Sequence, residues 1–130
     1  MDCSPSRKVN FSPARDPAGA DRKNGDMSRI VAVNQNEVAP REIYPGVRKR
    51  VLWQGTNGAK AQILEIDAGA KFLKLDVHHP GPEEIYVVSG TFNDGARDYP
   101  AGSFVHNPAG SSHLPQSPNG CVLFVFFPEG

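Results

Sequence analysis

The residues of this chain best suited to chemistry are its four histidines and two acidic residues. The two acids follow the first pair of histidines by a few positions. The histidines are His78, His79, His106 and His113, and the acids are Glu83 and Glu84. Imidazole and carboxylate groups are the usual protein ligands of Fe(II), Mn(II), Ni(II) and Zn(II). A set of two histidines and one carboxylate leaves coordination positions open for a substrate or O₂. The composition of this group predicts a site for one divalent metal ion.

The spacing selects three of these residues as ligands. His79 and Glu83 flank the turn-forming residues 80–82, and His113 comes after a second turn at residues 108–110. Each turn places a metal-ligating residue at the end or the start of an expected strand. If the strands pair within one barrel, the three side chains converge on one interior point. We therefore expect His79, Glu83 and His113 to hold the metal, although Glu84 remains an alternative carboxylate.

The elements that must position these residues are short strands. Apolar runs separated by Gly, Pro and Asn predict strands at residues 29–33, 46–54, 59–67, 71–79, 84–89, 103–107 and 121–127, with a shorter one within 90–95. Thr56-Asn57-Gly58 is a hairpin signal. Residues 29–130 contain no clear helix pattern. Strands at this spacing are typical of an all-β sandwich or barrel.

Alternation along residues 71–79 predicts which side chains face the interior. Leu73, Leu75, Val77 and His79 share one face of this expected strand. Because that face is apolar, we expect it to be the interior. His78 then points outward, and it can join the metal only if a bulge shifts the register.

Residues 46–54 show a second alternation. Val47, Val51 and Trp53 fall on one face, whereas Arg48 and Arg50 fall on the other. The charged run at residues 48–50 is interpreted as a solvated strand face.

The final strand predicts a further layer. Residues 121–127 are apolar at every position, and a strand that is apolar on both faces needs cover on both. The second cover can be another sheet or a second subunit, and we expect a homodimer.

Composition narrows the partners and the compartment. The chain has 130 residues, enough for one domain, with 14 Lys+Arg against 14 Asp+Glu. A formal net charge of zero argues against nucleic-acid and membrane partners. Cys3 and Cys121 stand at opposite ends, and the sequence shows no secretion signal. We expect a cytoplasmic protein with a disordered or loosely packed tail over residues 1–28 and one folded domain over residues 29–130.

The segment over residues 79–127 resembles the cupin superfamily, whose motifs read G-x5-H-x-H-x3,4-E-x6-G and G-x5-P-x-G-x2-H-x3-N. The matches are His79-x3-Glu83-x6-Gly90 and Gly102-x5-Pro108-x-Gly110-x2-His113. The stretches HPGPEE, YPAG and PAGSSH look closest to the cupin domains of zinc-binding anti-sigma factors and to related small dioxygenases. The resemblance implies a jelly-roll β-barrel with one bound metal.

Two positions depart from the family pattern. Val77 stands where the family usually has its first His, and Ser117 stands where it has an Asn. We therefore expect three protein ligands instead of four. His106 and His78 remain alternatives for the missing ligand.

The resemblance implies two main functions. One is an Fe(II)-dependent dioxygenase that cleaves a C–C bond of a small diketone or hydroxyketone. The other is a non-catalytic sensor that binds a metal or a small molecule. A sugar epimerase or isomerase is less favoured, because no added His/Lys or His/Tyr base pair is evident at the expected interior positions.

Overall fold

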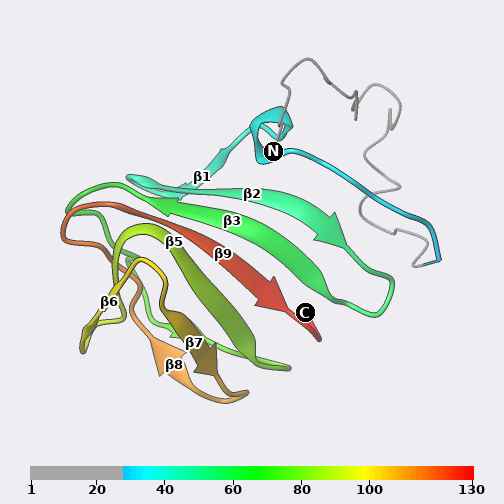
Figure 1. The fold of residues 1–130 in the computed structure, drawn as a ribbon. Coiled ribbons are helices and arrows are strands. Elements are labelled where there is room, and N and C mark those ends of the chain that lie inside the picture. The colour runs from blue at the N-terminus through cyan, green and yellow to red at the C-terminus, as the bar shows by residue number, and fades with distance from the viewer. Residues whose placement is uncertain (1–27) are drawn as a thin grey trace.

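Residues 28–130, which the computed structural model describes, form nine strands and one short 3₁₀ helix (Figure 1). Their bounds are η2 (Gln35–Glu37), β1 (Arg41–Tyr44), β2 (Val47–Gln54), β3 (Lys60–Ile66), β4 (Asp76–Val77), β5 (Glu83–Asn93), β6 (Asp98–Pro100), β7 (Phe104–Asn107), β8 (Ser112–His113) and β9 (Cys121–Phe127). The predicted tail over residues 1–28 lies, except for Ser28, outside the described residues. No helix in this part of the chain is long and apolar enough to cross a membrane.

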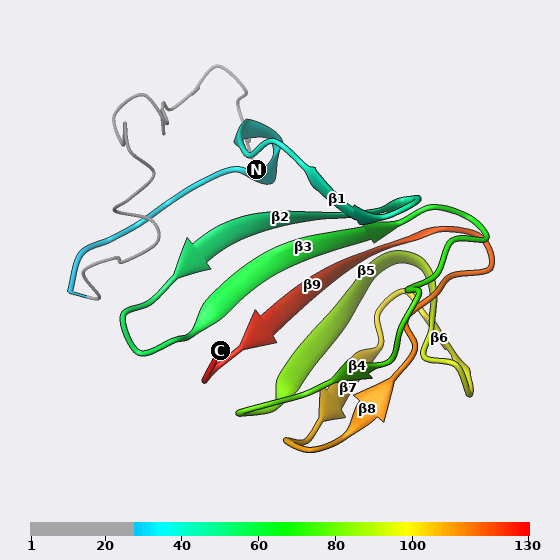
Figure 2. The same ribbon diagram turned by 180° about the vertical axis from the view of Figure 1, so that it is seen from behind.

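The strands form one large antiparallel sheet and one small one. The large sheet has the order β1-β2-β3-β9-β5-β6, and β7 also pairs with β5. β4 and β8 form the small sheet, which Figure 2 shows in front of β7 and beside β5. The large sheet curls so that its concave face and the small sheet enclose one interior. This arrangement confirms the predicted all-β architecture.

Most of the predicted strands are present, and two predictions fail. The expected strands at residues 46–54, 59–67, 84–89, 103–107 and 121–127 correspond to β2, β3, β5, β7 and β9. The prediction for residues 29–33 is wrong, because this segment has no regular structure. The prediction for residues 71–79 is wrong over most of its length, because only Asp76–Val77 forms a strand.

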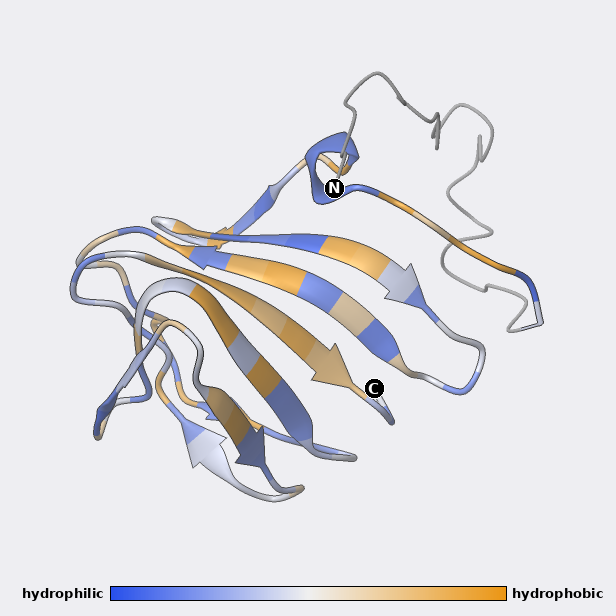
Figure 3. Cartoon of the chain, in the orientation of Figure 1, coloured by the Kyte–Doolittle hydropathy of each residue, from blue (hydrophilic) through white to orange (hydrophobic). Residues whose placement is uncertain are grey.

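The core lies on the concave face of the large sheet. Alternating polar and apolar bands along β3 and β5 (Figure 3) reflect the two-residue period of half-buried strands. The buried side chains come from β2, β3, β5 and β9: Val47, Leu64, Ile66, Ile85, Val87, Phe92, Cys121, Leu123 and Val125. Phe92 and Leu123 are fully buried, so they belong to the most tightly enclosed part of this core.

The convex face carries a row of aromatic side chains. Tyr86 on β5 pairs with Phe104 of β7 on one side and with Phe124 of β9 on the other. Phe104 is 64% exposed and Tyr86 is 47% exposed. We call these three residues the outer aromatic row. The prediction that β9 is apolar towards both faces is therefore confirmed, with only its concave face fully buried.

The charged run on β2 divides between the two faces. Arg48 contacts Glu65 and Asp67 at 3.2 and 2.8 Å, and Arg50 contacts Glu65 at 3.3 Å, all through charged groups on the convex side. Lys49 pairs across the sheet with Leu64, a core residue of the concave face. The interpretation of this run as a solvated face therefore fails for Lys49.

Candidate metal centre

The small sheet formed by β4 and β8 determines which side chains of these strands point into the interior. Asp76 of β4 lies opposite His113 of β8, and Val77 lies opposite Ser112. Residues directly opposite each other project from the same face, so Asp76 and His113 point together into the interior. Alternation continues past Val77, which brings His78 inward beside Asp76. Glu83, the first residue of β5, reaches the same place from the large sheet.

These four residues form a group that we call the inner cluster: Asp76, His78, Glu83 and His113. One ligand atom from each can be chosen so that all lie within 4.8 Å of one another. His113 Nε2 is 3.3 Å from Asp76 Oδ2 and 3.4 Å from Glu83 Oε1. His78 Nε2 is also 3.4 Å from Glu83 Oε1. The two imidazole rings pack edge to face, with centroids 4.5 Å apart.

The inner cluster fits a divalent metal ion. His78, Glu83 and His113 are each less than a tenth exposed. His78 Nε2, the atom that faces Glu83 in the cluster, is buried without a hydrogen-bond partner anywhere in residues 28–130. A buried polar atom without a partner is costly, and a nitrogen that binds a cation avoids this cost. Two carboxylates and two neutral imidazoles also balance the charge of a divalent ion.

The two carboxylates dominate the electrostatics of His113 in the metal-free chain. Burial by itself lowers the pKa of the imidazole, but the hydrogen bonds to Asp76 and Glu83 and their negative charges outweigh it. They raise the pKa of His113 to about 9. The cluster therefore already holds one positive charge, a proton, at neutral pH.

The structure differs from the sequence-based ligand set at one histidine. Glu83 and His113 are brought together as expected, but His78 stands beside them instead of His79. His78 is only 4% exposed, whereas His79 is exposed. The prediction that His79 faces inward and His78 outward is therefore wrong.

The physical reason is that residues 71–79 are not one continuous strand. Leu73, Leu75 and Val77, which were expected inside, are 68%, 58% and 57% exposed. The pairing of β4 with β8 fixes which face points inward, and this pairing reverses the face that apolar alternation favoured. Three apolar side chains consequently face solvent.

Asp76 is the residue that sequence reasoning missed. The motif count aligned Val77 with the family's first His, but Val77 points away from the cluster. The match Asp76-x-His78-x4-Glu83 has the family spacing with Asp in the first position. The longer spacing before the Glu is one that the cupin pattern also allows, so this signal was present in the sequence.

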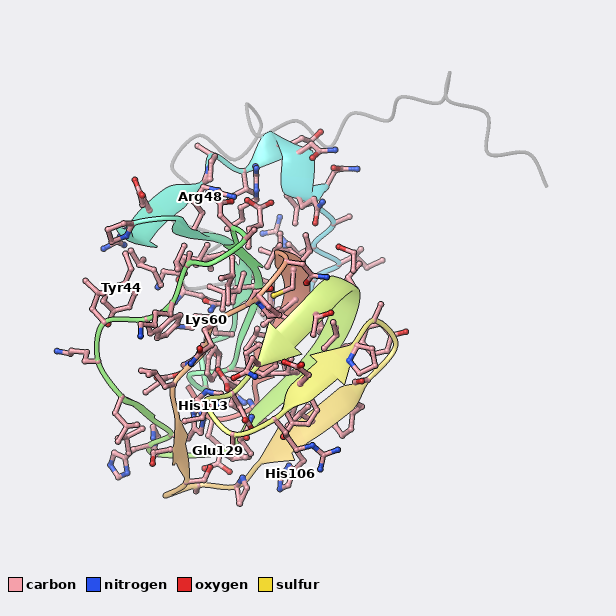
Figure 4. The ribbon with its side chains drawn as sticks, turned by 90° about the vertical axis from the view of Figure 1, so that its left-hand side faces the viewer. Tyr44, Arg48, Lys60, His106, His113 and Glu129 are labelled. Carbon is pink, nitrogen blue, oxygen red and sulfur yellow. The ribbon has the colours of Figure 1, made fainter. Side chains whose placement is uncertain are left out.

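His106 takes no part in the inner cluster. Its Nδ1 lies 2.8 Å from Glu84 Oε1 on the convex face. Figure 4 shows His113 inside the barrel and His106 at its lower edge. His106 and Glu84, the alternative ligands expected from the sequence, therefore both lie outside the inner cluster.

A cavity of about 170 Å³ adjoins the inner cluster. Asp76, Glu83 and His113 form part of its wall. Most of the remaining wall is apolar and comes from the core and its margins: Ile43, Leu64, Phe72, Ile85, Phe92, Pro115, Leu123 and Phe127. Three polar side chains complete the wall: Lys49, Lys60 and Gln62. Such a cavity suits a small molecule that places polar atoms at the cluster and apolar atoms against the core.

The fold and the cluster agree with the chain's similarity to known proteins. The family described as "ChrR Cupin-like domain" matches residues 27–129, which is most of the chain. The chain belongs to this cupin family. No curated protein matches the sequence significantly.

Solved structures share the cupin fold at low sequence identity. An RmlC-like cupin from Shewanella frigidimarina is 22% identical, with a TM-score of 0.66 over 75% of this chain and 89% of that one. An acetylacetone dioxygenase from Acinetobacter johnsonii is 18% identical, with a TM-score of 0.67 over 82% of this chain and 77% of that one. The polyketide cyclase RemF from Streptomyces resistomycificus is 18% identical, with a TM-score of 0.67 over 78% and 81%. At these identities the likeness shows the fold alone.

Proposed function

We propose that this cupin is a metal-dependent enzyme of the dioxygenase class whose inner cluster holds one Fe(II) ion. Its substrate is a small diketone or hydroxyketone, and both atoms of O₂ enter the products of C–C cleavage. The observation that carries the proposal is a buried set of two histidines and two carboxylates with converging ligand atoms beside a small apolar cavity. The fold shared with an acetylacetone dioxygenase supports the same reaction class.

In this proposal the inner cluster holds the ion, and the apolar residues of the cavity wall position the ligand. Asp76, His78, Glu83 and His113 would hold the ion and would leave coordination positions open for a chelating pair of oxygens or for O₂. A bound ion of this kind supplies Lewis-acid polarisation of the chelated oxygens and, as Fe(II), access to O₂ chemistry. The ring of Phe92 is fully buried and packs edge to face against the His113 imidazole, with centroids 6.0 Å apart. This contact restricts the orientation of the imidazole. Leu123 and Ile85 present apolar surface to the ligand and exclude water.

The test combines metal analysis with O₂ uptake. Protein purified without added metal is analysed for Fe, Zn, Ni and Mn, then loaded with Fe(II) and supplied with acetylacetone and a panel of hydroxyketones. We expect one O₂ consumed for each substrate molecule cleaved, with loss of activity in His78→Ala and retention in His79→Ala. Absence of turnover across the panel would contradict the proposal.

The family match favours a second candidate, a non-catalytic metal-binding or ligand-binding domain. It requires the same inner cluster, and it differs from the first only in that the bound metal promotes no reaction. Tightly bound Zn(II) in the purified protein, together with no O₂ uptake after exchange for Fe(II), would favour this function. The cytoplasmic compartment remains a prediction under both functions.

We also propose that the chain forms a homodimer through the outer aromatic row. Phe104, Tyr86 and Phe124 present a contiguous apolar surface, and exposed patches of this kind mark interaction sites. Light scattering after size exclusion should give twice the 14.1 kDa of one chain. Phe104→Lys should give the monomer, whereas Leu73→Lys, at a residue that is also exposed but outside this row, should not. A monomeric parent protein would contradict the proposal.

A further inference from the structure

The cavity beside the inner cluster has a cationic end. Lys49 of β2 and Lys60 and Gln62 of β3 line it together with the metal-site residues. Lys49 pairs with Leu64, and Lys60, Gln62 and Leu64 alternate along β3, so all of them project from the concave face. Figure 4 shows Lys60 within the same opening of the barrel as His113.

Neither lysine of this end has an acidic partner within residues 28–130. The Lys60 ammonium lies 5.0 Å from the centre of the Phe127 ring, which is a cation–π contact. Burial, followed by the positive charges of Lys60 and Arg41, lowers the pKa of Lys49. Lys49 lies opposite Leu64, four residues along β3 from Lys60, so the two backbones stand roughly 13 Å apart along the strands and only their side chains approach each other in the cavity. Two ammonium groups on the wall of one partly buried cavity cost free energy, and an anion that both of them reach recovers it.

Gln62 adds a polar atom without a partner to the same end. Its Oε1 is buried and accepts no hydrogen bond from any residue of the described part of the chain. The residue as a whole is only 7% exposed. Because this oxygen only accepts, it needs a water or a ligand group that donates a hydrogen bond, and an acceptor-only group such as a carboxylate cannot satisfy it.

The register fixes the separation between Lys60 and the inner cluster. Lys60 pairs with Phe127 of β9, and Glu84 of β5 pairs with the preceding residue, Phe126. Lys60, Phe127 and Glu83 thus lie in one row across three adjacent strands. Two strand spacings place the backbones of Lys60 and Glu83 roughly 10 Å apart. After allowing for both side chains, a ligand with a short carbon chain can span this distance.

We propose that the ligand of this site is a small monoanion, with a pair of metal-chelating oxygens at one end and a carboxylate at the other that Lys49 and Lys60 bind. The inference rests on the proposed function, because the chelating end needs the metal. It narrows the substrate from a neutral diketone to a diketone or hydroxyketone that carries an acid group. The apolar wall from Leu64, Leu123 and Phe127 accommodates the carbon chain between the two ends.

The experiment compares two probes that differ only in charge. Succinylacetone is a β-diketone that ends in a carboxylate, and its primary amide is the neutral counterpart. Binding of each is measured by calorimetry to protein loaded with Zn(II), which is redox-inactive and does not consume the probe. Four proteins are compared: the parent chain, Lys49→Met, the Lys49→Met/Lys60→Met double variant and Lys71→Met. Lys71 is an exposed lysine outside the cavity and serves as the matched control.

We expect the parent protein to bind the acid at least about tenfold more tightly than the amide, because charge-assisted hydrogen bonds are the stronger kind. The preference should fall in Lys49→Met, vanish in the double variant and persist in Lys71→Met. Equal binding of acid and amide by the parent protein would overturn the proposal, as would a preference that survives in the double variant.

Two further measurements separate this inference from the proposed function. Zn(II) affinity should be the same in the parent protein and the double variant, which shows that the lysines act on the ligand and not on the metal. The probes are also titrated into metal-free protein. If no metal binds but the acid is still preferred, the proposed function fails and the anion site stands. If metal binds and neither probe does, the anion site fails and the metal site stands.

Discussion

The neighbouring pair His78 and His79 offers the sharpest test of the metal centre. The two residues are identical in chemistry and adjacent in sequence, but the structure buries His78 in the inner cluster and leaves His79 exposed. His78→Ala removes one of four ligands. His79→Ala removes a side chain that faces solvent. The two variants therefore form a matched pair in which each controls for the other.

The size of the expected effect depends on the position of His78. Removing a residue that only supports a metal ligand costs about 10–100-fold in metal affinity. Loss of a ligand should therefore cost more than about 100-fold, which corresponds to about 2.8 kcal/mol. His79→Ala should change the affinity by less than about threefold, since surface substitutions are usually within ±0.5 kcal/mol.

The assay is competition for Zn(II) against a chromogenic chelator at a pH of about 7.5, where free imidazole is mostly neutral. Thermal unfolding of the metal-free proteins checks that both variants fold. If His78→Ala does not fold, His78→Gln replaces it, because glutamine keeps more of the buried side-chain volume. A larger loss in His79→Ala than in His78→Ala would refute the assigned geometry and restore the ligand set expected from sequence alternation.

Three further predictions test other parts of the structure. Because His113 has a pKa raised to about 9 in the metal-free chain and must be neutral to bind metal, binding near neutral pH should release about one proton, and metal affinity should rise with pH until about 9; calorimetry in buffers of different ionisation enthalpy measures the release, and its absence would contradict the assigned site. Val77→His should leave metal affinity unchanged, because this side chain is 57% exposed and points away from the cluster; a gain in affinity would mean that β4 presents its other face. Gly90 of β5 has a φ of 75°, and a Cβ there would overlap the carbonyl oxygen of Gly120; Gly90→Ala should therefore lose more than about 2 kcal/mol in urea unfolding, and an unchanged midpoint would show that the strand backbone relaxes to make room.

The sequence by itself determined the long strands and the fold family. β2, β3, β5 and β9 each have at least seven residues, which is long enough for apolar periodicity and flanking turn residues to identify them. The spacing of Glu83 and His113 within the two motifs was enough to identify the cupin family. These features are local, because they depend on residues a few positions apart.

The shortest elements depended on tertiary contacts. β4 and β8 have two residues each, which is too few for a period to indicate a face. Apolar alternation favoured Leu73, Leu75 and Val77 as interior residues, and all three are exposed. A short strand has little burial energy of its own, so its partner decides which side chains turn inward.

Only the tertiary structure decided between the two alignments of the first motif that the sequence allows. The pairing of β4 with β8 directs Asp76 and His78 inward, and no property of residues 71–79 alone distinguishes that arrangement from its opposite. The two lysines of the cavity wall have the same origin, because strand pairing turns Lys49 of β2 and Lys60 of β3 towards the same concave face. A one-residue change in strand register exchanges the two faces of a strand. The sequence therefore indicated a site of histidines and a carboxylate, and strand pairing determined which individual residues reach it, including Asp76 and the lysines of the cavity wall.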